Sequence, residues 1–249
     1  MGSGWLSAAG TNILIWGLRN SAGGVRFRFG RNEMKTGVGI TDEGAWREAI
    51  RQRVLAASEG GVIASRGDND LNPGMKPLRK TLTPAAVLVA LVDRPDGFTV
   101  LLTQRTDHLR DHAGQISFPG GKIEEHDEDP VATALREAEE EVGLAPHKVE
   151  VVGSLDRYVT RTGFAVTPVV GFVDPPFTLK LDPFEVAEVF EVPLRHFLTP
   201  GNRQQHSYEL EGVTRRFYAM PYNDYYIWGA TAGMLVNLAD ILMAERVSS

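Results

Sequence analysis

Three glutamates in the middle of the chain are spaced so that a helix brings their side chains together. Glu137, Glu140 and Glu141 stand at positions i, i+3 and i+4 of the run REAEEEVGL, and these positions share one helix face. Carboxylates at such short separations repel, and a hard divalent cation such as Mg²⁺ or Mn²⁺, which prefers oxygen ligands, relieves the repulsion. The spacing predicts either a metal site or, as for most isolated acidic runs, a solvated helix face on which Arg136 pairs with Glu140.

A glycine-rich turn lies just before the acidic run. Residues 118–122 read FPGGK, and glycines at such a turn let main-chain groups approach a ligand closely. Six residues separate Gly121 from Glu128, and seven separate Glu128 from Arg136. By itself this turn is only a tight loop, and the choice between the two interpretations depends on the longer pattern to which the turn and the helix belong.

The gapped pattern from Gly121 to Leu144 resembles the signature of the Nudix hydrolase family, G-x5-E-x7-R-E-U-x-E-E-x-G-U, in which U is aliphatic. It departs from that signature by one additional residue in the first gap and by the small Ala138 at the first aliphatic position. The resemblance implies an α+β fold, the Nudix α/β/α sandwich with a mixed sheet. It also implies that Arg136 holds Glu137 in place and that Mg²⁺ or Mn²⁺ is bound by the carbonyl of Gly120 and by Glu137, Glu140 and Glu141.

The resemblance leaves the general base open. In the wider family the attacking water loses its proton either to a residue of this helix or to a carboxylate on a later loop. The segment PFEVAE at residues 183–188 offers Glu185 and Glu188, and we expect Glu185 to serve.

A second pattern precedes the glycine turn. Residues 101–121 read LLTQRTDHLRDHAGQISFPGG, which is similar to the coenzyme A box of the CoA-pyrophosphatase branch, L-L-T-x-R-S/A-x3-R-x3-G-x3-F-P-G-G. Thr106 is the one departure, at a position where Ser or Ala is usual. Segments 162–171 and 226–233 also resemble this branch. The resemblance implies hydrolysis of the pyrophosphate of coenzyme A to 4'-phosphopantetheine and adenosine 3',5'-bisphosphate.

Several side chains around these motifs are candidates for substrate binding. Arg105 and Arg110 match phosphate oxygens bidentately, although either could instead form a structural salt bridge. Gly121 and Lys122 are expected near the phosphates, or Lys122 neutralises the acidic loop that follows it. Three aromatic residues could stack on adenine, line the pantetheine groove or fill the core: Phe164, Tyr226 and Trp228. Three histidines are not expected to bind the metal: His108, His112 and His126.

Two other functions fit the same motifs. Residues 120–124, GGKIE, also resemble nucleotide-sanitising relatives, which would make the substrate another nucleoside diphosphate derivative or an oxidised nucleotide. A catalytically silent sensor of CoA or a nucleotide would use the fold for binding alone. The intact set of Arg136 and three glutamates argues against the sensor, because a silent protein has no need to tolerate their repulsion.

Composition excludes other classes of protein. The 249 residues carry a net charge of −6 and no Cys, which excludes disulfides, Cys-ligated zinc and a thiol nucleophile. The negative charge argues against a surface for nucleic acid. The longest apolar runs, at 13–18 and 85–92, are far shorter than a membrane span. We therefore predict a soluble, cytoplasmic enzyme with a small-molecule substrate.

The chain divides into an extension at residues 1–80 and a Nudix domain at 81–249. The extension begins with an Arg-containing segment that loosely resembles an organelle transit peptide, although a flexible start is the preferred interpretation. Its helix at about 42–57 has an apolar stripe that packs on its own domain or on a second subunit, and we predict a homodimer. The domain is expected to contain a hairpin of residues 85–92 and 98–102, strands at 149–155, 166–173, 186–192 and 215–220, and helices at 129–142 and 230–246.

Overall fold

The computed structural model describes residues 43–59, 65–108, 114–210 and 212–244. The resemblance to a transit peptide concerns residues outside these ranges, as do the expectations for Arg110 and His112. None of the helices in the described ranges is long and apolar enough to cross a membrane.

A mixed sheet of nine strands forms the centre of the described structure. Strand β2 (Thr83–Val92) runs parallel to β8 (Phe164–Val173) over ten residue pairs. It also forms the predicted antiparallel hairpin with β3 (Thr99–Arg105), where Leu91 faces Val100. Long runs of Val, Leu and Ala suit β2 and β8 to this position, because both faces of a central strand are buried. The other strands are β1 (Ser65–Gly67), β4 (Ile116–Ser117), β5 (Gly120–Lys122), β6 (Val149–Ser154), β7 (Arg157–Val159) and β9 (Val186–Pro193).

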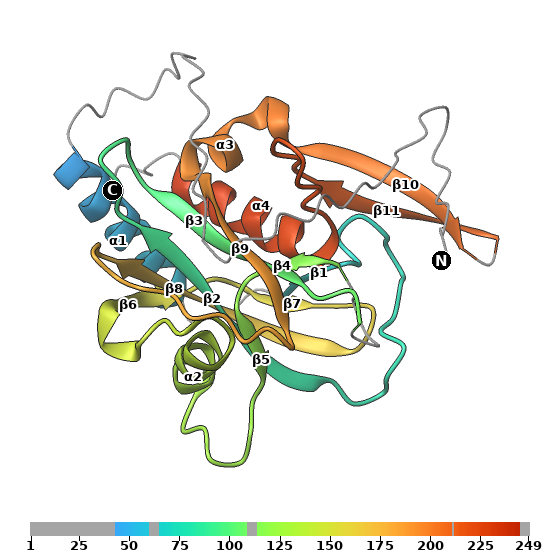
Figure 1. Cartoon of the computed structure of the whole chain (residues 1–249). Coiled ribbons are helices and arrows are strands. Elements are labelled where there is room, and N and C mark those ends of the chain that lie inside the picture. The colour runs from blue at the N-terminus through green and yellow to red at the C-terminus, as the bar shows by residue number, and fades with distance from the viewer. Residues whose placement is uncertain (1–42, 60–64, 109–113, 211, 245–249) are drawn as a thin grey trace.

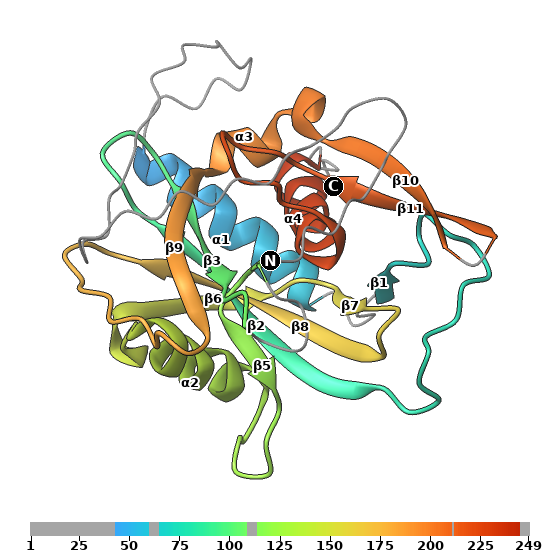
Figure 2. The ribbon, with the colours of Figure 1, turned by 45° about the vertical axis from the view of Figure 1, so that its right-hand side comes forward.

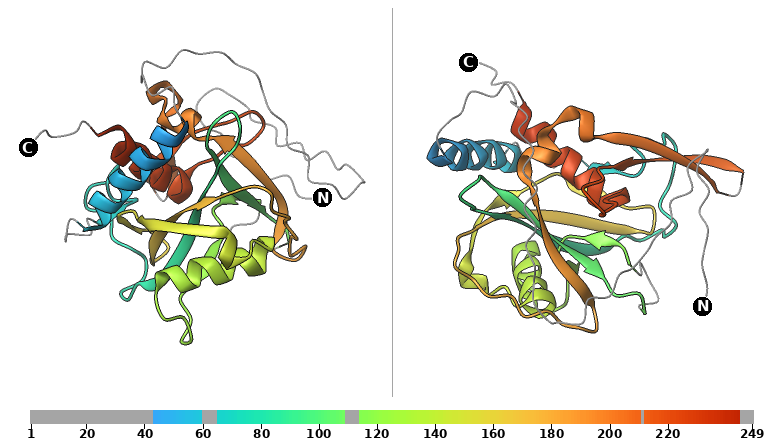
Figure 3. Two further views of the ribbon diagram at one scale, coloured as in Figure 1. Left: turned by 90° about the vertical axis from the view of Figure 1, so that its left-hand side faces the viewer. Right: turned by 45° about the horizontal axis from the view of Figure 1, so that its top comes forward.

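Helices cover both faces of this sheet (Figure 1, Figure 3). Helix α2 (Pro130–Val142) lies on one face, where its Ala134 and Ala138 pack with Leu88 and Leu101. The other face carries α1 (Glu43–Glu59), α3 (Leu194–Leu198) and α4 (Gly229–Met243). The predicted α/β/α sandwich with a mixed sheet is therefore confirmed.

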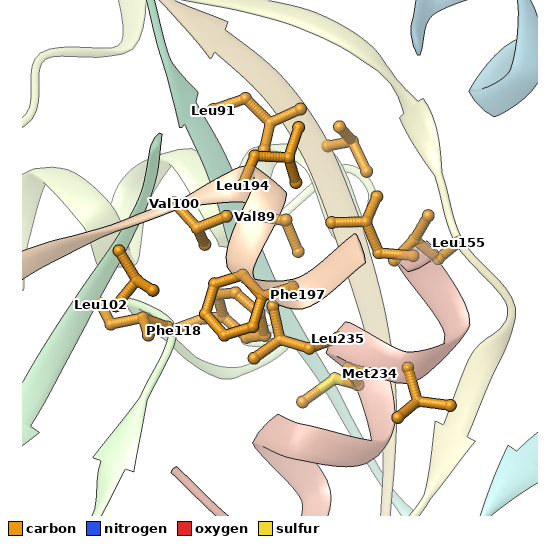
Figure 4. Packing of buried hydrophobic residues seen from close by; sticks show 14 of the residues in the cluster. Val89, Leu91, Val100, Leu102, Phe118, Leu155, Leu194, Phe197, Met234 and Leu235 are labelled. Carbon is orange, nitrogen blue, oxygen red and sulfur yellow. The ribbon is translucent and has the colours of Figure 1, made fainter. Parts of the chain in front are cut away.

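Figure 4 shows the core beneath α3 and α4, where Phe197 and Leu235 lie against strand residues such as Val89 and Val100. All four side chains are almost completely removed from solvent. Burial of apolar surface is the main favourable contribution to the free energy of folding. The helices on this face are therefore needed to cover the apolar side chains of the sheet.

Helix α1 packs on the domain that follows it. Ile50 and Val54 are fully buried, and the guanidinium of Arg47 bridges the carboxylates of Asp93 and Asp174. The apolar stripe of the predicted helix is thus covered within the same chain. The homodimer and the boundary near residue 80 stay predictions.

Strands β10 (Gln204–Leu210) and β11 (Val213–Ala219) form a separate two-stranded sheet that extends from the body (Figure 2). Two short 3₁₀ helices, η1 (Pro146–Lys148) and η2 (Pro200–Asn202), complete the described elements.

Candidate active site

Helix α2, which carries the three glutamates, has well-defined ends. At its start the side chain of Asp129 accepts a hydrogen bond from the amide of Ala132 at 2.8 Å, and Pro130 occupies the first turn. At its end Gly143 adopts a left-handed conformation with φ 71°, which permits the amide of Leu144 to bond back to Ala138. The predicted helix at 129–142 is confirmed.

The three glutamates lie in different environments. Glu141 is only 5% exposed, Glu137 is mostly buried, and Glu140 extends into solvent. Burial raises the pKa of Glu141 to about 8, although the nearby Arg105 opposes this shift. Burial also raises the pKa of Glu137. Burial therefore disfavours the charged form of two of the three carboxylates, although an arginine lies near each of them.

The glycine turn allows the main chain to lie directly against these carboxylates. Strand β5 pairs with β2, and a methyl group on Gly120 would collide with the carbonyl oxygen of Ala86. A methyl group on Gly121 would collide with the carboxylate of Glu137. The amide of Gly120 approaches Oε2 of Glu141 at 3.4 Å. Only glycine fits at position 120, where the contact is with backbone, and a larger residue at 121 would displace the Glu137 carboxylate, consistent with the close main-chain approach expected from the sequence.

Arg136 is held by a residue that the sequence analysis missed. Its Nε and Nη2 each donate to a different oxygen of Asp127, both at 2.9 Å. The Asp127 side chain is 3% exposed and also accepts hydrogen bonds from the Glu124 amide and the Thr133 hydroxyl. The guanidinium of Arg136 keeps the pKa of Asp127 well below its usual range.

Glu128, which the sequence comparison aligned with the glutamate of the signature, is exposed. Five residues separate Gly121 from Asp127, so the spacing G-x5 leads to Asp127 and the additional residue falls in the second gap. Counting the signature with an aspartate allowed at that position would have identified Asp127.

Arg136, held by Asp127, in turn hydrogen-bonds to two of the glutamates. Its Nη1 donates to Oε1 of Glu137 and to Oε2 of Glu140, both at 3.0 Å. The two pairs expected from the sequence, Arg136 with Glu137 and Arg136 with Glu140, are therefore both present. A third bond joins Nη2 to the carbonyl of Lys122, whose own side chain is exposed.

Arg105, at the end of β3, lies between two carboxylates. Its Nη1 is 3.8 Å from Oε1 of Glu141, and its Nη2 is 3.9 Å from Oε2 of Glu185. Both distances exceed a direct hydrogen bond. Glu188 is directed elsewhere, since its Oε1 accepts a hydrogen bond from the hydroxyl of Tyr225 at 2.8 Å. The structure thus brings Glu185, but not Glu188, to the arginine beside the helix.

The aromatic candidates lie apart from the carboxylates. Tyr226 and Trp228 contact rings of the β10–β11 hairpin, and Phe164 lies under the guanidinium of Arg79. The ring of His108 lies 4.9 Å from that of Phe184, and His126 is exposed beside Glu124. A cavity lined by Asp68, Tyr158 and Gly233 belongs to the α4 side of the sheet and contains none of the predicted site residues.

The donor set fits a hard divalent cation. All three side-chain donors are carboxylates, and burial raises the pKa of two of them despite the nearby arginines, so an added cation would stabilise their charged form. Across the described ranges no three Asp, Glu or His side chains already form a metal cluster, because Glu140 is directed to solvent and paired with Arg136.

Residues 82–211 of the chain match the family model described as the NUDIX domain. The chain belongs to the Nudix family. This Nudix chain is 44% identical over 163 residues to a protein of Escherichia coli K12 named "Uncharacterized Nudix hydrolase NudL", across 65% of the chain and 84% of the relative. A relative with the same name from Shigella boydii gives the same values.

Solved Nudix structures are more distant. The NUDIX domain of Shewanella oneidensis NrtR complexed with ADP ribose is 23% identical, with a TM-score of 0.38 over 48% of this chain and 78% of that one. A Caenorhabditis elegans Ap4A hydrolase is 20% identical, with a TM-score of 0.38 over 45% and 80%. The family prediction from the sequence is confirmed, and none of these names specifies a substrate for this chain.

Proposed function

We propose that this Nudix hydrolase cleaves the pyrophosphate bond of coenzyme A or a CoA derivative, giving 4'-phosphopantetheine or its acyl form and adenosine 3',5'-bisphosphate. The position of Arg105 carries the proposal. This residue belongs to the segment that resembles the CoA box, and its guanidinium lies beside Glu141 of the Nudix helix and Glu185. Residues 101–121, which resemble the CoA box, therefore border the carboxylates at which we expect the pyrophosphate to be hydrolysed.

Glu137, Glu140 and Glu141 would hold Mg²⁺ or Mn²⁺ together with the carbonyl of Gly120. A bound divalent cation supplies positive charge that stabilises the negative charge developing on the pyrophosphate oxygens. Both carboxylates with a raised pKa belong to this set, so the protein folds with a site that favours added positive charge.

The chain's own residues position the reactants. Arg105 has donors that are not engaged at hydrogen-bonding distance by Glu141 or Glu185, so it can bind phosphate oxygens. Gly121 and Lys122 border the same site, and Arg110 is assigned to substrate binding from the CoA box. Arg136, fixed by Asp127, holds Glu137 in one orientation.

Glu185 is the proposed general base. Its carboxylate accepts a proton from the attacking water as the water oxygen bonds to one phosphorus and the bridging P–O bond breaks. The leaving phosphate monoester departs with the electrons of that bond. Glu188 is less suited, because its Oε1 is occupied by the Tyr225 hydroxyl.

Product analysis tests the proposal. The protein is incubated with Mg²⁺ or Mn²⁺ and, in parallel, with CoA, acetyl-CoA, ADP-ribose, NADH and 8-oxo-dGTP. Formation of adenosine 3',5'-bisphosphate from CoA or acetyl-CoA, without comparable turnover of the other three, is the expected result. Preferential cleavage of another nucleotide would overturn the CoA assignment, and binding of CoA without turnover under either metal would favour a sensor.

A further inference from the structure

Phe184 is an unusually exposed aromatic side chain for a residue beside the site. It is 63% exposed, and among the large apolar residues of the described ranges only Leu78, at 67%, is more exposed. It directly precedes Glu185, the carboxylate nearest to Arg105 on that loop. An exposed aromatic ring at a binding site indicates a ligand surface, because its apolar area gains from being covered.

The main chain around Phe184 is fixed on both sides. Its amide donates to Oδ1 of Asp182 at 2.8 Å, and its carbonyl accepts from the hydroxyl of Thr106 at 2.7 Å. The amide of Thr106 in turn donates to the carbonyl of Glu185 at 3.0 Å. Thr106, the one departure from the CoA box, thereby ties the loop to β3. The main chain that carries the ring is therefore fixed before a ligand arrives, which lowers the entropy cost of ordering this loop on binding.

Among the described residues, the ring of Phe184 has one aromatic neighbour, which does not cover it. His108 lies with its ring centroid 4.9 Å from that of Phe184 and is tilted by 56°. His108 is exposed as well. The rings of Phe184 and His108 therefore lie against each other and are both open to solvent.

From helix α2 to Phe184, the residues of the site run from charged side chains to aromatic ones. Glu141 contacts Arg105, Arg105 contacts Glu185, and Phe184 adjoins Glu185 in the chain. A nucleotide has the same order, with a charged pyrophosphate at one end and a flat purine at the other. The aromatic residues considered from the sequence, Tyr226 and Trp228, pack on the β10–β11 hairpin instead.

We propose that Phe184, flanked by His108, is the surface on which the purine base of the substrate stacks while its phosphates lie at Arg105. The proposal rests on the proposed function to the extent that the substrate is a nucleotide pyrophosphate. It does not require that the substrate be CoA.

Isothermal titration calorimetry with two probes tests this assignment, without added Mg²⁺ or Mn²⁺ so that the phosphoanhydride bond of pyrophosphate is not hydrolysed. Adenosine 3',5'-bisphosphate has a base and inorganic pyrophosphate has none, so their difference isolates stacking. Phe184→Ala should weaken binding of adenosine 3',5'-bisphosphate by about 5- to 100-fold, the effect of removing one base–aromatic stack, and leave pyrophosphate binding within about twofold. Phe184→Tyr should retain binding. Leu78→Ala, which removes an equally exposed apolar side chain outside the site, should bind both probes like wild type.

Kinetics give an independent readout. With whichever nucleotide is cleaved, Phe184→Ala should raise KM and leave kcat within about twofold, because the base is bound equally in the ground and transition states. Unchanged binding of adenosine 3',5'-bisphosphate in Phe184→Ala, or equal losses for both probes, would overturn the stacking assignment even if CoA is cleaved. Selective loss of the base-containing probe, with no CoA turnover by wild type, would support the stacking assignment and refute the proposed function.

Discussion

Arg136 and the buried Asp127 form an ion pair with two hydrogen bonds, from Nε to Oδ1 and from Nη2 to Oδ2, each 2.9 Å long. The pair matters because Arg136 also donates to Glu137 and Glu140. Asp127 is buried, and it also accepts hydrogen bonds from the Glu124 amide and the Thr133 hydroxyl. The orientation of Glu137 and Glu140 therefore depends on a residue that acts on them through Arg136.

Asp127→Asn tests this dependence. The amide can no longer accept both guanidinium bonds, so Arg136 loses its fixed orientation and we expect kcat/KM to fall by about 10- to 100-fold, as for other residues that orient metal ligands. Glu128→Gln, next in the chain and exposed, serves as the matched control and should behave like wild type. Equal effects of the two substitutions would mean that the ion pair has no role in positioning.

Glu140→Gln separates catalysis from folding. Because Glu140 is 60% exposed, the neutral variant should unfold at the wild-type temperature, whereas kcat should fall by at least about 100-fold through a weakened metal site. The neighbouring Glu139→Gln, also exposed, is the control for loss of one negative charge. Near-normal turnover of Glu140→Gln would contradict its assignment as a metal ligand.

Glu141→Gln should preserve the stability of the metal-free protein and weaken metal binding. The buried carboxylate has its arginine, Arg105, 3.8 Å away and beyond hydrogen-bonding distance, so its replacement by a neutral isostere should leave the metal-free protein at least as stable as wild type. Mg²⁺ should raise the unfolding temperature of wild type and raise it much less in the variant. Thermal unfolding with and without Mg²⁺ measures both quantities, and an equal shift in the two proteins would argue against Glu141 as a ligand.

Glu185→Gln and Glu188→Gln distinguish the two candidate bases. Loss of a general base lowers kcat by about 10²- to 10⁴-fold, and we expect this for Glu185→Gln. Glu188→Gln should retain kcat within a few fold, because that side chain bonds to Tyr225 and does not face Arg105. The reverse order in steady-state kcat would transfer the role to Glu188.

His196 predicts a pH dependence of stability that is independent of catalysis. Burial lowers its pKa, and Asn202 donates to its Nδ1 at 3.0 Å, so the neutral ring is preferred in the folded state. A histidine whose folded pKa lies below its unfolded value of about 6.5 gives full stability above that pH and loses stability as pH falls below it. The unfolding temperature of wild type should therefore fall more steeply from pH 7 to pH 5 than that of His196→Phe. The exposed His147→Phe should retain the wild-type slope.

Much of the fold follows from sequence patterns that are local. The 3.6-residue period predicts α1, α2 and α4 to within a few residues, and apolar runs predict β2, β3, β6, β8, β9 and β11. β10 reads QQHSYEL and is largely exposed on both faces, so it lacks the alternation that identifies a strand. The three-residue strands β1 and β7 and the five-residue α3 are too short to show any period.

The site is predictable where it lies on one helix and not where it joins distant segments. Glu137, Glu140 and Glu141 could be grouped from helix spacing alone. The approach of Arg105 to Glu185 depends on the pairing of β3 with β9, in which Arg105 faces Val186, and no local pattern specifies that register. The bond between Tyr225 and Glu188 likewise depends on a tertiary contact.

An internal competition assay tests the choice of CoA most directly. Equimolar CoA, ADP-ribose and 8-oxo-dGTP are mixed with the enzyme and Mg²⁺, and the relative rates of their disappearance give the ratios of kcat/KM. We predict that CoA disappears first, with adenosine 3',5'-bisphosphate as a product, and that Arg105→Ala removes this preference. Faster loss of either competitor from the wild-type reaction would contradict the assignment of CoA as the substrate.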